Sequence, residues 1–202
     1  MSTKLKIAAA VAAAVLLSAC SSPKHEPMPL VNFTPSMEVT EVWSKGLSSA
    51  EGFLVPAVYD DMVFAAGGKT LTRLNARTGE TEWSVSFDSP ITGGVGSGGY
   101  LTAVGLWDGN LEVVDAEGKV SWEKKLTTEL ASPPVVSHGL VIARTMDTRV
   151  SAFEASSGEL QWTYQKSQPA LTVRLPTRML AHDNFLLVGS PASPDSASSA
   201  SR

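Results

Sequence analysis

The fold is decided by the stretch Leu71-Thr-Arg-Leu-Asn-Ala76-Arg-Thr-Gly79-Glu-Thr-Glu-Trp83, because it recurs twice further along the chain. The next copy is Leu111-Glu-Val-Val-Asp-Ala116-Glu-Gly118-Lys-Val-Ser-Trp122, which lacks one turn residue, and the last is Val150-Ser-Ala-Phe-Glu-Ala155-Ser-Ser-Gly158-Glu-Leu-Gln-Trp162. With Trp43, the tryptophans are spaced by 40, 39 and 40 residues. This register indicates an internal repeat of about 40 residues.

A second shared piece lies upstream of each copy: residues 55–65, 94–103 and 132–143. Each unit therefore contains four short segments rich in β-branched and aromatic residues, separated by turn residues such as Asp60-Asp61 and His138-Gly139. Convincing helical periodicity is absent from the sequence after the leader. We predict an all-β chain in which each repeat is one four-stranded β-propeller blade, giving an incomplete ring of about three blades after an initial strand near Trp43.

The recurring residues have physical roles in such a blade. A tight hairpin turn requires positive φ, which costs glycine little, so we expect it at Gly79, Gly118 and Gly158. The tryptophan that follows can bury ~150 to 250 Å² between neighbouring blades. The alanines of the repeat, Ala76, Ala116 and Ala155, would leave room for its ring.

The first 19 residues have the pattern of a signal peptide: Lys4 and Lys6, an apolar run over 7–17, then Ser18 and Ala19. The apolar run is too short for a transmembrane helix. Leu17-Ser-Ala-Cys20 resembles the bacterial lipobox, which implies cleavage before Cys20 and its acylation, palmitate included. The alternative is an ordinary signal peptide with an incidental cysteine. Ser21, in place of aspartate, resembles lipoproteins sent to the outer membrane.

Residues 20–35 are polar and proline-rich, which is typical of a flexible tether between lipid and globular domain. Cys20 is the sole cysteine, so the body has no thiol for a disulfide or a metal site. The formal charge of −4 becomes −6 once Lys4 and Lys6 leave with the leader. This acidic balance argues against nucleic acid or anionic lipid as the main partner.

The Ala-x-x-x-Gly-x-x-x-Trp blocks resemble the PQQ-like repeat family, shared by quinoprotein dehydrogenases and by non-enzymatic propellers. With the lipobox and the tether, the chain is most similar to the propeller lipoproteins of the machinery that inserts outer-membrane β-barrels. The resemblance covers residues 1 to about 174. It implies an eight-bladed ring, no cofactor, and a scaffold role at the periplasmic face of the outer membrane.

The resemblance stops after about residue 174, because a Ser, Ala and Pro mixture follows where the family continues with another blade. We therefore divide the chain into a signal peptide (1–19), a tether (20–35), a partial propeller (36–174) and a divergent, disordered tail (175–202). A truncated or frame-shifted product and a natural variant with a disordered tail are the two explanations.

The sequence gives little support to catalysis. Gly94-Val-Gly-Ser-Gly-Gly99 fits the dinucleotide motif by letters, but a strand and not a helix is predicted to follow it, so a turn is the better interpretation. His25, His138 and His182 lack metal-ligand spacing, and Ser121-x-x-Lys124 lies on a predicted outer strand. We predict no enzyme, metal or cofactor. The alternative is a fragment of a PQQ-dependent quinoprotein oxidoreductase, which would need a quinone site with acidic ligands.

The resemblance also implies a partner site. In the family, the connection after this blade contacts a POTRA domain of the barrel-inserting subunit through two aliphatic residues and an arginine, which match Leu171, Val173 and Arg174. Alternating aliphatic residues would present one apolar face, and arginine can bind carboxylate or carbonyl oxygens. The residues alone favour a core-facing strand, and only the family resemblance favours the partner site. Because the acidic family residues that complete the surface lie in later blades, and because the departure at Leu175 would leave the connection unsupported, we expect weak or no binding by this chain.

Overall fold

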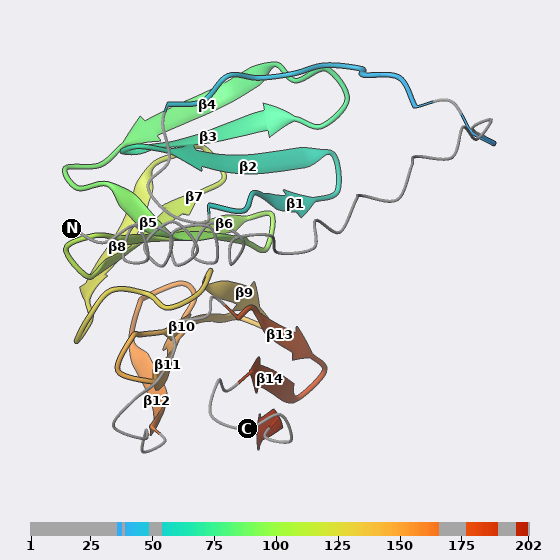
Figure 1. Cartoon of the computed structure of the whole chain (residues 1–202). Coiled ribbons are helices and arrows are strands. Elements are labelled where there is room, and N and C mark those ends of the chain that lie inside the picture. Colours follow the sequence, from blue (N-terminus) through green and yellow to red (C-terminus); the bar gives the residue numbers. More distant parts are fainter. Residues whose placement is uncertain (1–35, 38, 49–53, 166–176, 190–196, 202) are drawn as a thin grey trace, which may run out of the picture. The chain divides into compact units, whose positions relative to one another are not determined.

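Three four-stranded antiparallel sheets follow one another along the chain, each with its strands in sequence order (Figure 1). The computed structural model describes residues 36–37, 39–48, 54–165, 177–189 and 197–201. Blade 1 contains β1 (Ala57–Tyr59), β2 (Met62–Gly67), β3 (Thr70–Asn75) and β4 (Thr81–Ser86). Blade 2 contains β5 (Ile91–Ser97), β6 (Leu101–Leu106), β7 (Asn110–Asp115) and β8 (Val120–Lys125). Blade 3 contains β9 (Val135–Ser137), β10 (Leu140–Arg144), β11 (Arg149–Glu154) and β12 (Leu160–Gln165). The all-β propeller class and the three blades are confirmed, and the described residues contain no helix, membrane-spanning or otherwise.

A fourth sheet follows, formed by β13 (Met179–His182), β14 (Phe185–Gly189) and β15 (Ala197–Ser201). The prediction of a disordered tail over 175–202 is therefore wrong for these residues. The reason is local: an apolar run before the Ser-rich end forms a hairpin and buries Met179 and Leu186 against blade 3. The prediction of disorder was based on the serine and proline content after residue 190 and did not take this apolar run into account.

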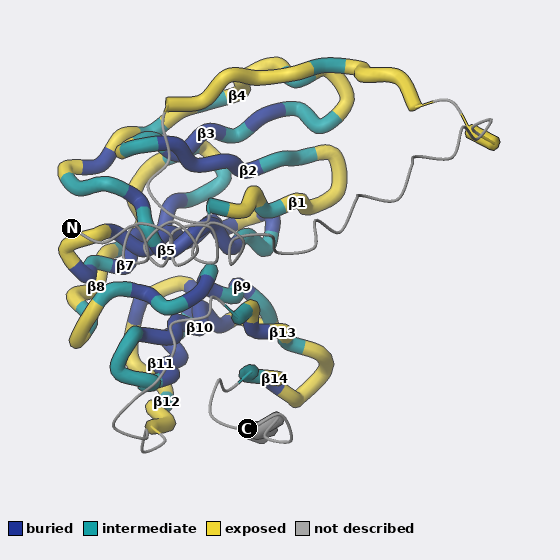
Figure 2. The backbone as a smooth tube through the Cα atoms, viewed as in Figure 1, coloured by how far each residue is buried: buried dark blue, intermediate teal, exposed yellow. Residues whose placement is uncertain are grey.

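Apolar cores lie between successive sheets, not within them. Each blade buries the apolar residues of its two middle strands, while its outer strand is largely exposed, as Figure 2 shows for β10, β11 and β12. Phe64 and Val114 belong to the core between blades 1 and 2, Val113 and Val141 to the next core, and Ile142 to the core that includes Leu186 of the fourth sheet. Because side chains alternate across a strand, blades 2 and 3 each contribute to the core on either side of them.

In blades 1 and 2, the recurring tryptophan joins the outer strand to the following blade through its ring and its indole N–H. Trp83 Nε1 donates to Ala116 O at 2.9 Å, and a Cβ added to Gly118 would lie 2.8 Å from the Trp83 ring. Trp122 has the same relation to Ala155 and Gly158, at 2.8 Å and 2.7 Å. These glycines have φ of 81° and 70°. The glycine is therefore needed twice, for its backbone angle and for the flat contact with the ring.

Trp43 makes the same contacts with blade 1, but its segment forms no β-ladder with any described residue. Its Nε1 donates to Ala76 O at 2.9 Å, and its ring lies over Gly79. Residues 41–48 are nevertheless not a strand. The predicted initial strand is thus present as the tryptophan contact alone, because a strand requires a hydrogen-bonded neighbour.

Candidate protein-binding site

The connections between blades lie at the same end of each sheet as the turn between its second and third strands, because four antiparallel strands alternate in direction. These connections span residues 87–90, 126–134 and 166–178. The first two are fixed to those turns by main-chain hydrogen bonds: Phe87 N donates to Lys69 O at 2.9 Å, and Leu126 N donates to Gly109 O at 3.0 Å.

The predicted partner residues Leu171, Val173 and Arg174 fall in the third connection and lie outside the described residues, as does the acylation site Cys20. Both ends of that connection are described. It leaves blade 3 after Gln165 and reaches the fourth sheet at Thr177. The structure therefore shows what fixes the residues that flank the connection.

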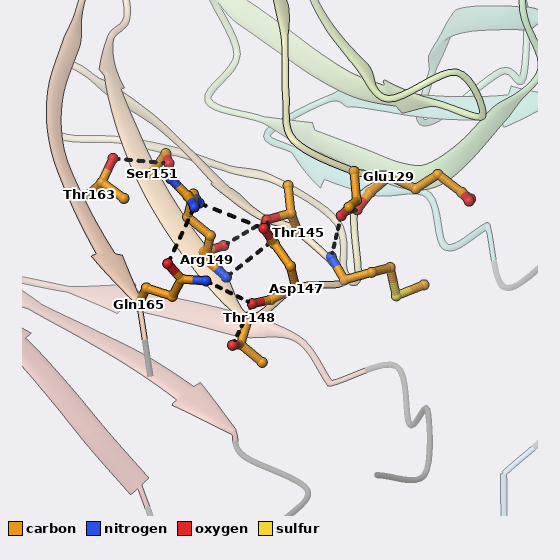
Figure 3. Close-up of polar contacts among 10 residues, drawn as sticks. Glu129, Thr145, Asp147, Thr148, Arg149, Ser151, Thr163 and Gln165 are labelled. Carbon is orange, nitrogen blue, oxygen red and sulfur yellow. Dashed lines mark hydrogen bonds and ion pairs between the residues drawn. The ribbon is translucent and has the colours of Figure 1, made fainter. Parts of the chain in front are cut away.

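At the first end, a polar network ties the end of β12 to the turn between β10 and β11 (Figure 3). Arg149 Nη2 donates to Gln165 Oε1 at 3.3 Å, and Gln165 Nε2 donates to Asp147 O at 3.4 Å. Arg149 Nε lies 3.7 Å from Asp147 Oδ2, and the Thr145 hydroxyl donates to Asp147 Oδ1. Burial opposes ionisation of Asp147, but hydrogen bonds from Thr145 and Thr127, with Arg149, lower its pKa overall. The carboxylate thus stays charged and holds the turn.

At the second end, a buried arginine fixes the place where the connection enters the fourth sheet. Arg144 is 7% exposed, and its Nη1 donates to Thr177 Oγ1 at 2.7 Å and to Gly189 O at 2.8 Å. Burial lowers its pKa. A buried guanidinium is costly to leave without hydrogen-bond acceptors. These two hydrogen bonds from Arg144 therefore fix Thr177 and the end of β14.

Arg144 was missed by the sequence argument. Its position in the repeat is occupied by Ala66 in blade 1 and Gly105 in blade 2, which are the small residues expected in a packed strand. The signal was an arginine that closes the apolar run Leu140-Val-Ile-Ala-Arg144. Among the three blades, an arginine stands at this position in blade 3 alone.

The residues considered for catalysis do not converge. No group of three His, Cys, Asp or Glu side chains among the described residues could hold a metal ion. His138 accepts or donates a 2.7 Å hydrogen bond with Ser137 in an exposed turn, and His182 is exposed beside Asp183. In the Gly94–Gly99 motif, residues 94–97 belong to β5 and the last two glycines to the turn before β6, so no helix N-terminus is formed there. Ser121 and Lys124 lie exposed on β8.

Comparison with known proteins identifies a family for the chain and solved structures that share its fold. The family profile described as "Outer membrane protein assembly factor BamB" matches residues 67–197. The protein of that name from Burkholderia pseudomallei (strain K96243) is 37% identical over 189 residues, which are 91% of this chain and 50% of the relative. The crystal structure of BamB from Moraxella catarrhalis has a TM-score of 0.60 and 27% identity, over 67% of this chain and 42% of that one. The crystal structure of the computationally designed Ika4 protein shares the fold, with a TM-score of 0.60 and 16% identity, over 79% of this chain and 99% of that one.

The internal repeat and the series of four-stranded sheets define a β-propeller of the PQQ-like repeat class. Within that class, the chain belongs to the family of the outer membrane protein assembly factor BamB. It spans about half the length of the curated relatives it matches. The family match extends to residue 197, beyond the end near residue 174 that the sequence argument gave to the resemblance.

Proposed function

We propose that this chain is a non-catalytic scaffold lipoprotein of the outer-membrane β-barrel assembly machinery. It would be held at the periplasmic face of the outer membrane through acylated Cys20 and would bind a POTRA domain of the barrel-inserting subunit, thereby assisting insertion of outer-membrane proteins. Membership in a family named for outer membrane protein assembly supports this role. The observation that supports the site is that the residues flanking the third connection are fixed, Gln165 by Arg149 and Asp147 and Thr177 by Arg144.

The binding test uses a purified POTRA region and measures its affinity for this chain. Arg174→Ala should weaken binding at least about tenfold, which corresponds to ~1.4 kcal/mol, because arginine anchors contribute strongly at interfaces. Arg178→Ala is the matched control, since Arg178 is an exposed arginine of the same connection. Equal affinity for the two variants would remove Arg174 from the site.

A second variant separates contact from positioning. Arg144→Met removes the hydrogen bonds to Thr177 and Gly189 while keeping an unbranched buried side chain, so the connection should lose its fixed end. We expect weaker POTRA binding with the Trp83 and Trp122 contacts retained, as judged from near-ultraviolet circular dichroism. Full binding by this variant would show that the connection is not held through Arg144.

Anchoring is tested independently of binding. Cys20→Ala should abolish labelling with radioactive palmitate and block processing of the leader, while Ser21→Ala should leave both intact. Labelling of the Cys20→Ala protein would contradict the lipoprotein assignment.

Oxidoreductase activity with a bound quinone cofactor is the competing function. Acidic side chains would have to converge on the calcium ion of a quinone site, and no group of three His, Cys, Asp or Glu side chains among the described residues could hold a metal ion. A spectroscopic titration with pyrroloquinoline quinone should therefore give no saturable binding. Stoichiometric binding would favour the oxidoreductase alternative.

A further inference from the structure

Trp107 is an exposed tryptophan that the repeat does not explain. It lies in the turn between β6 and β7, outside the regular spacing of the repeat tryptophans at positions 43, 83, 122 and 162. It packs in none of the three apolar cores and is 60% exposed. Its Nε1 has no acceptor among the described residues, whereas Trp83 and Trp122 donate to the next blade. Because tryptophan is enriched among the residues that dominate binding energy, this side chain is a candidate for contact with a partner.

Hydrogen bonds fix the backbone of this turn. Trp107 N donates to Pro90 O in the first connection at 2.8 Å. Asn110 N donates to Asp108 Oδ1 at 3.1 Å, and Lys125 Nζ donates to Asp108 O. A side chain on a fixed backbone has less conformational freedom to lose when a partner binds, which favours affinity. The turn therefore presents the indole at a defined place on the surface.

The turn of Trp107 is joined by contacts to the residues that flank the third connection. The second connection is bonded to this turn through Gly109 O, and to the next turn along through Met146 N, which donates to Glu129 O at 3.0 Å. That next turn, between β10 and β11, is bonded in its place to Gln165, where the third connection begins. Both turns lie at the end of the sheets where the connections lie. The turn of Trp107 is thus continuous with the candidate site.

Blade 3 has a second apolar side chain at the equivalent turn position. Gly105 pairs with Leu111 and Arg144 with Val150, and Trp107 and Met146 each follow these pairs by two residues. Both main-chain N–H groups donate to the preceding connection, and Met146 is half-buried. Successive blades therefore place an apolar side chain at this end. Exposed charged residues flank the Trp107 turn, as in the polar rim of a protein interface.

We propose that Trp107 is an anchor of the partner-binding surface: the POTRA domain that contacts the third connection also buries the Trp107 indole. This inference rests on the proposed function for the identity of the partner. The domain would provide an aliphatic hollow for the ring and an oxygen acceptor for Nε1, with charged groups opposite Asp108 and Lys125. The site then extends from the third connection across blade 3 to blade 2.

The affinity of a purified POTRA region for the full chain tests the anchor. Trp107→Ala should weaken binding about thirtyfold, which corresponds to ~2 kcal/mol, because a buried tryptophan anchor contributes strongly. Trp107→Phe should weaken it less, since phenylalanine keeps an aromatic ring and lacks the N–H.

Tyr100→Ala is the matched control. Tyr100 is an aromatic residue that is 53% exposed in the turn between β5 and β6, at the opposite end of the same blade, so this variant should bind as the unsubstituted chain does. Neither Trp107 nor Tyr100 packs in an apolar core, so all three variants should keep the midpoint of urea unfolding. A change confined to binding identifies Trp107 as a contact residue and not as a structural one.

Photo-crosslinking in cells identifies what touches this position and also captures weak complexes. The probe p-benzoylphenylalanine in place of Trp107 should form an adduct with a POTRA domain of the barrel-inserting subunit. The same probe in place of Tyr100 should form none. Adding Arg174→Ala should lower the yield of the Trp107 adduct, because one domain contacts both places.

The outcomes separate this inference from the proposed function. If binding depended on Arg174 while Trp107→Ala and Tyr100→Ala bound equally well, the anchor would be wrong and the proposed function would stand. An adduct at position 107 with a different protein would also overturn the anchor. If the POTRA region bound none of these proteins and no adduct formed in cells, the anchor and the proposed function would both be wrong.

Discussion

A tryptophan side chain recurs at the junctions between blades beside each apolar core, and the glycine beneath it permits that contact. Gly118 has φ of 81°, and its Cα faces the Trp83 ring. Sequence reasoning could give the positive φ, because a shortened turn with glycine at a fixed place requires it. It could not show that the ring comes from the preceding blade, because that follows from how the blades stack and not from any one repeat.

Gly118→Ala tests the contact at the residue scale. The substitution combines left-handed strain of about 1–2 kcal/mol with a Cβ placed 2.8 Å from Trp83, so we expect a loss of roughly 2–4 kcal/mol in the free energy of unfolding. Gly139→Ala is the matched control, because Gly139 has φ of 74° with open space around it. It should cost about 1–2 kcal/mol. Urea denaturation measures both, and equal losses would show that the ring contact adds nothing.

Glu112 makes blade 2 sensitive to pH. At the equivalent position the flanking blades pair hydroxyls, Thr72 with Ser84 at 3.1 Å and Ser151 with Thr163 at 3.2 Å, whereas Glu112 pairs with Glu123. Glu112 is 6% exposed. Burial, and then the neighbouring charge of Glu123 with smaller effects of Asp108 and Asp88, raises the pKa of Glu112 to about 7.

The sign of the effect follows from that direction. A folded-state pKa above the unfolded value of 4.5 means that protonated Glu112 contributes stability below pH 4.5, and that this contribution is lost as pH rises through about 7. The midpoint of urea unfolding should therefore fall over this range. Glu112→Gln should flatten the dependence by up to about 3 kcal/mol, and Glu123→Gln should flatten it partly. An unchanged profile in Glu112→Gln would exclude Glu112 as its source.

At the scale of elements, two-residue hairpin turns begin three of the four sheets. Asp60, His138 and Asp183 each have φ near +50°, at the same place between the first and second strands. This recurrence was visible in the sequence, since Asp183-Asn184 lies before the apolar run from Phe185 as His138-Gly139 lies before the run from Leu140. Period and turn chemistry thus predicted the first three blades. β15 could not be predicted, because its pairing with β14 compensates for a composition that is poor in strand-forming residues.

Asp183 tests whether that turn holds the fourth sheet. Asp183→Gly should stabilise the β13–β14 hairpin or leave it unchanged, whereas Asp183→Ala should weaken it by about 1 kcal/mol, because a Cβ disfavours positive φ and alanine lacks the short polar side chain that tolerates it. The readout is amide hydrogen exchange of Leu186. The same exchange rate in both variants would mean that the turn does not determine the hairpin's stability.

At the scale of the whole molecule, each sheet packs on the next through a separate core, so stability is shared between neighbours along the series. Blade 2 has a core on both faces, and Val113 and Val114 of β7 are fully buried. The fourth sheet has a described core on one face. We expect amide protection to be highest in β7 and lowest in β14, because opening β14 disrupts one core.

Ile142→Ala separates these cores. Ile142 packs in the core with Leu186 and Met179, so the substitution should cost about 2–5 kcal/mol locally and speed exchange in β14 while β7 exchanges at nearly its original rate. If Ile142→Ala accelerated exchange equally in β7 and β14, the blades would unfold as one cooperative unit and the nearest-neighbour description would fail.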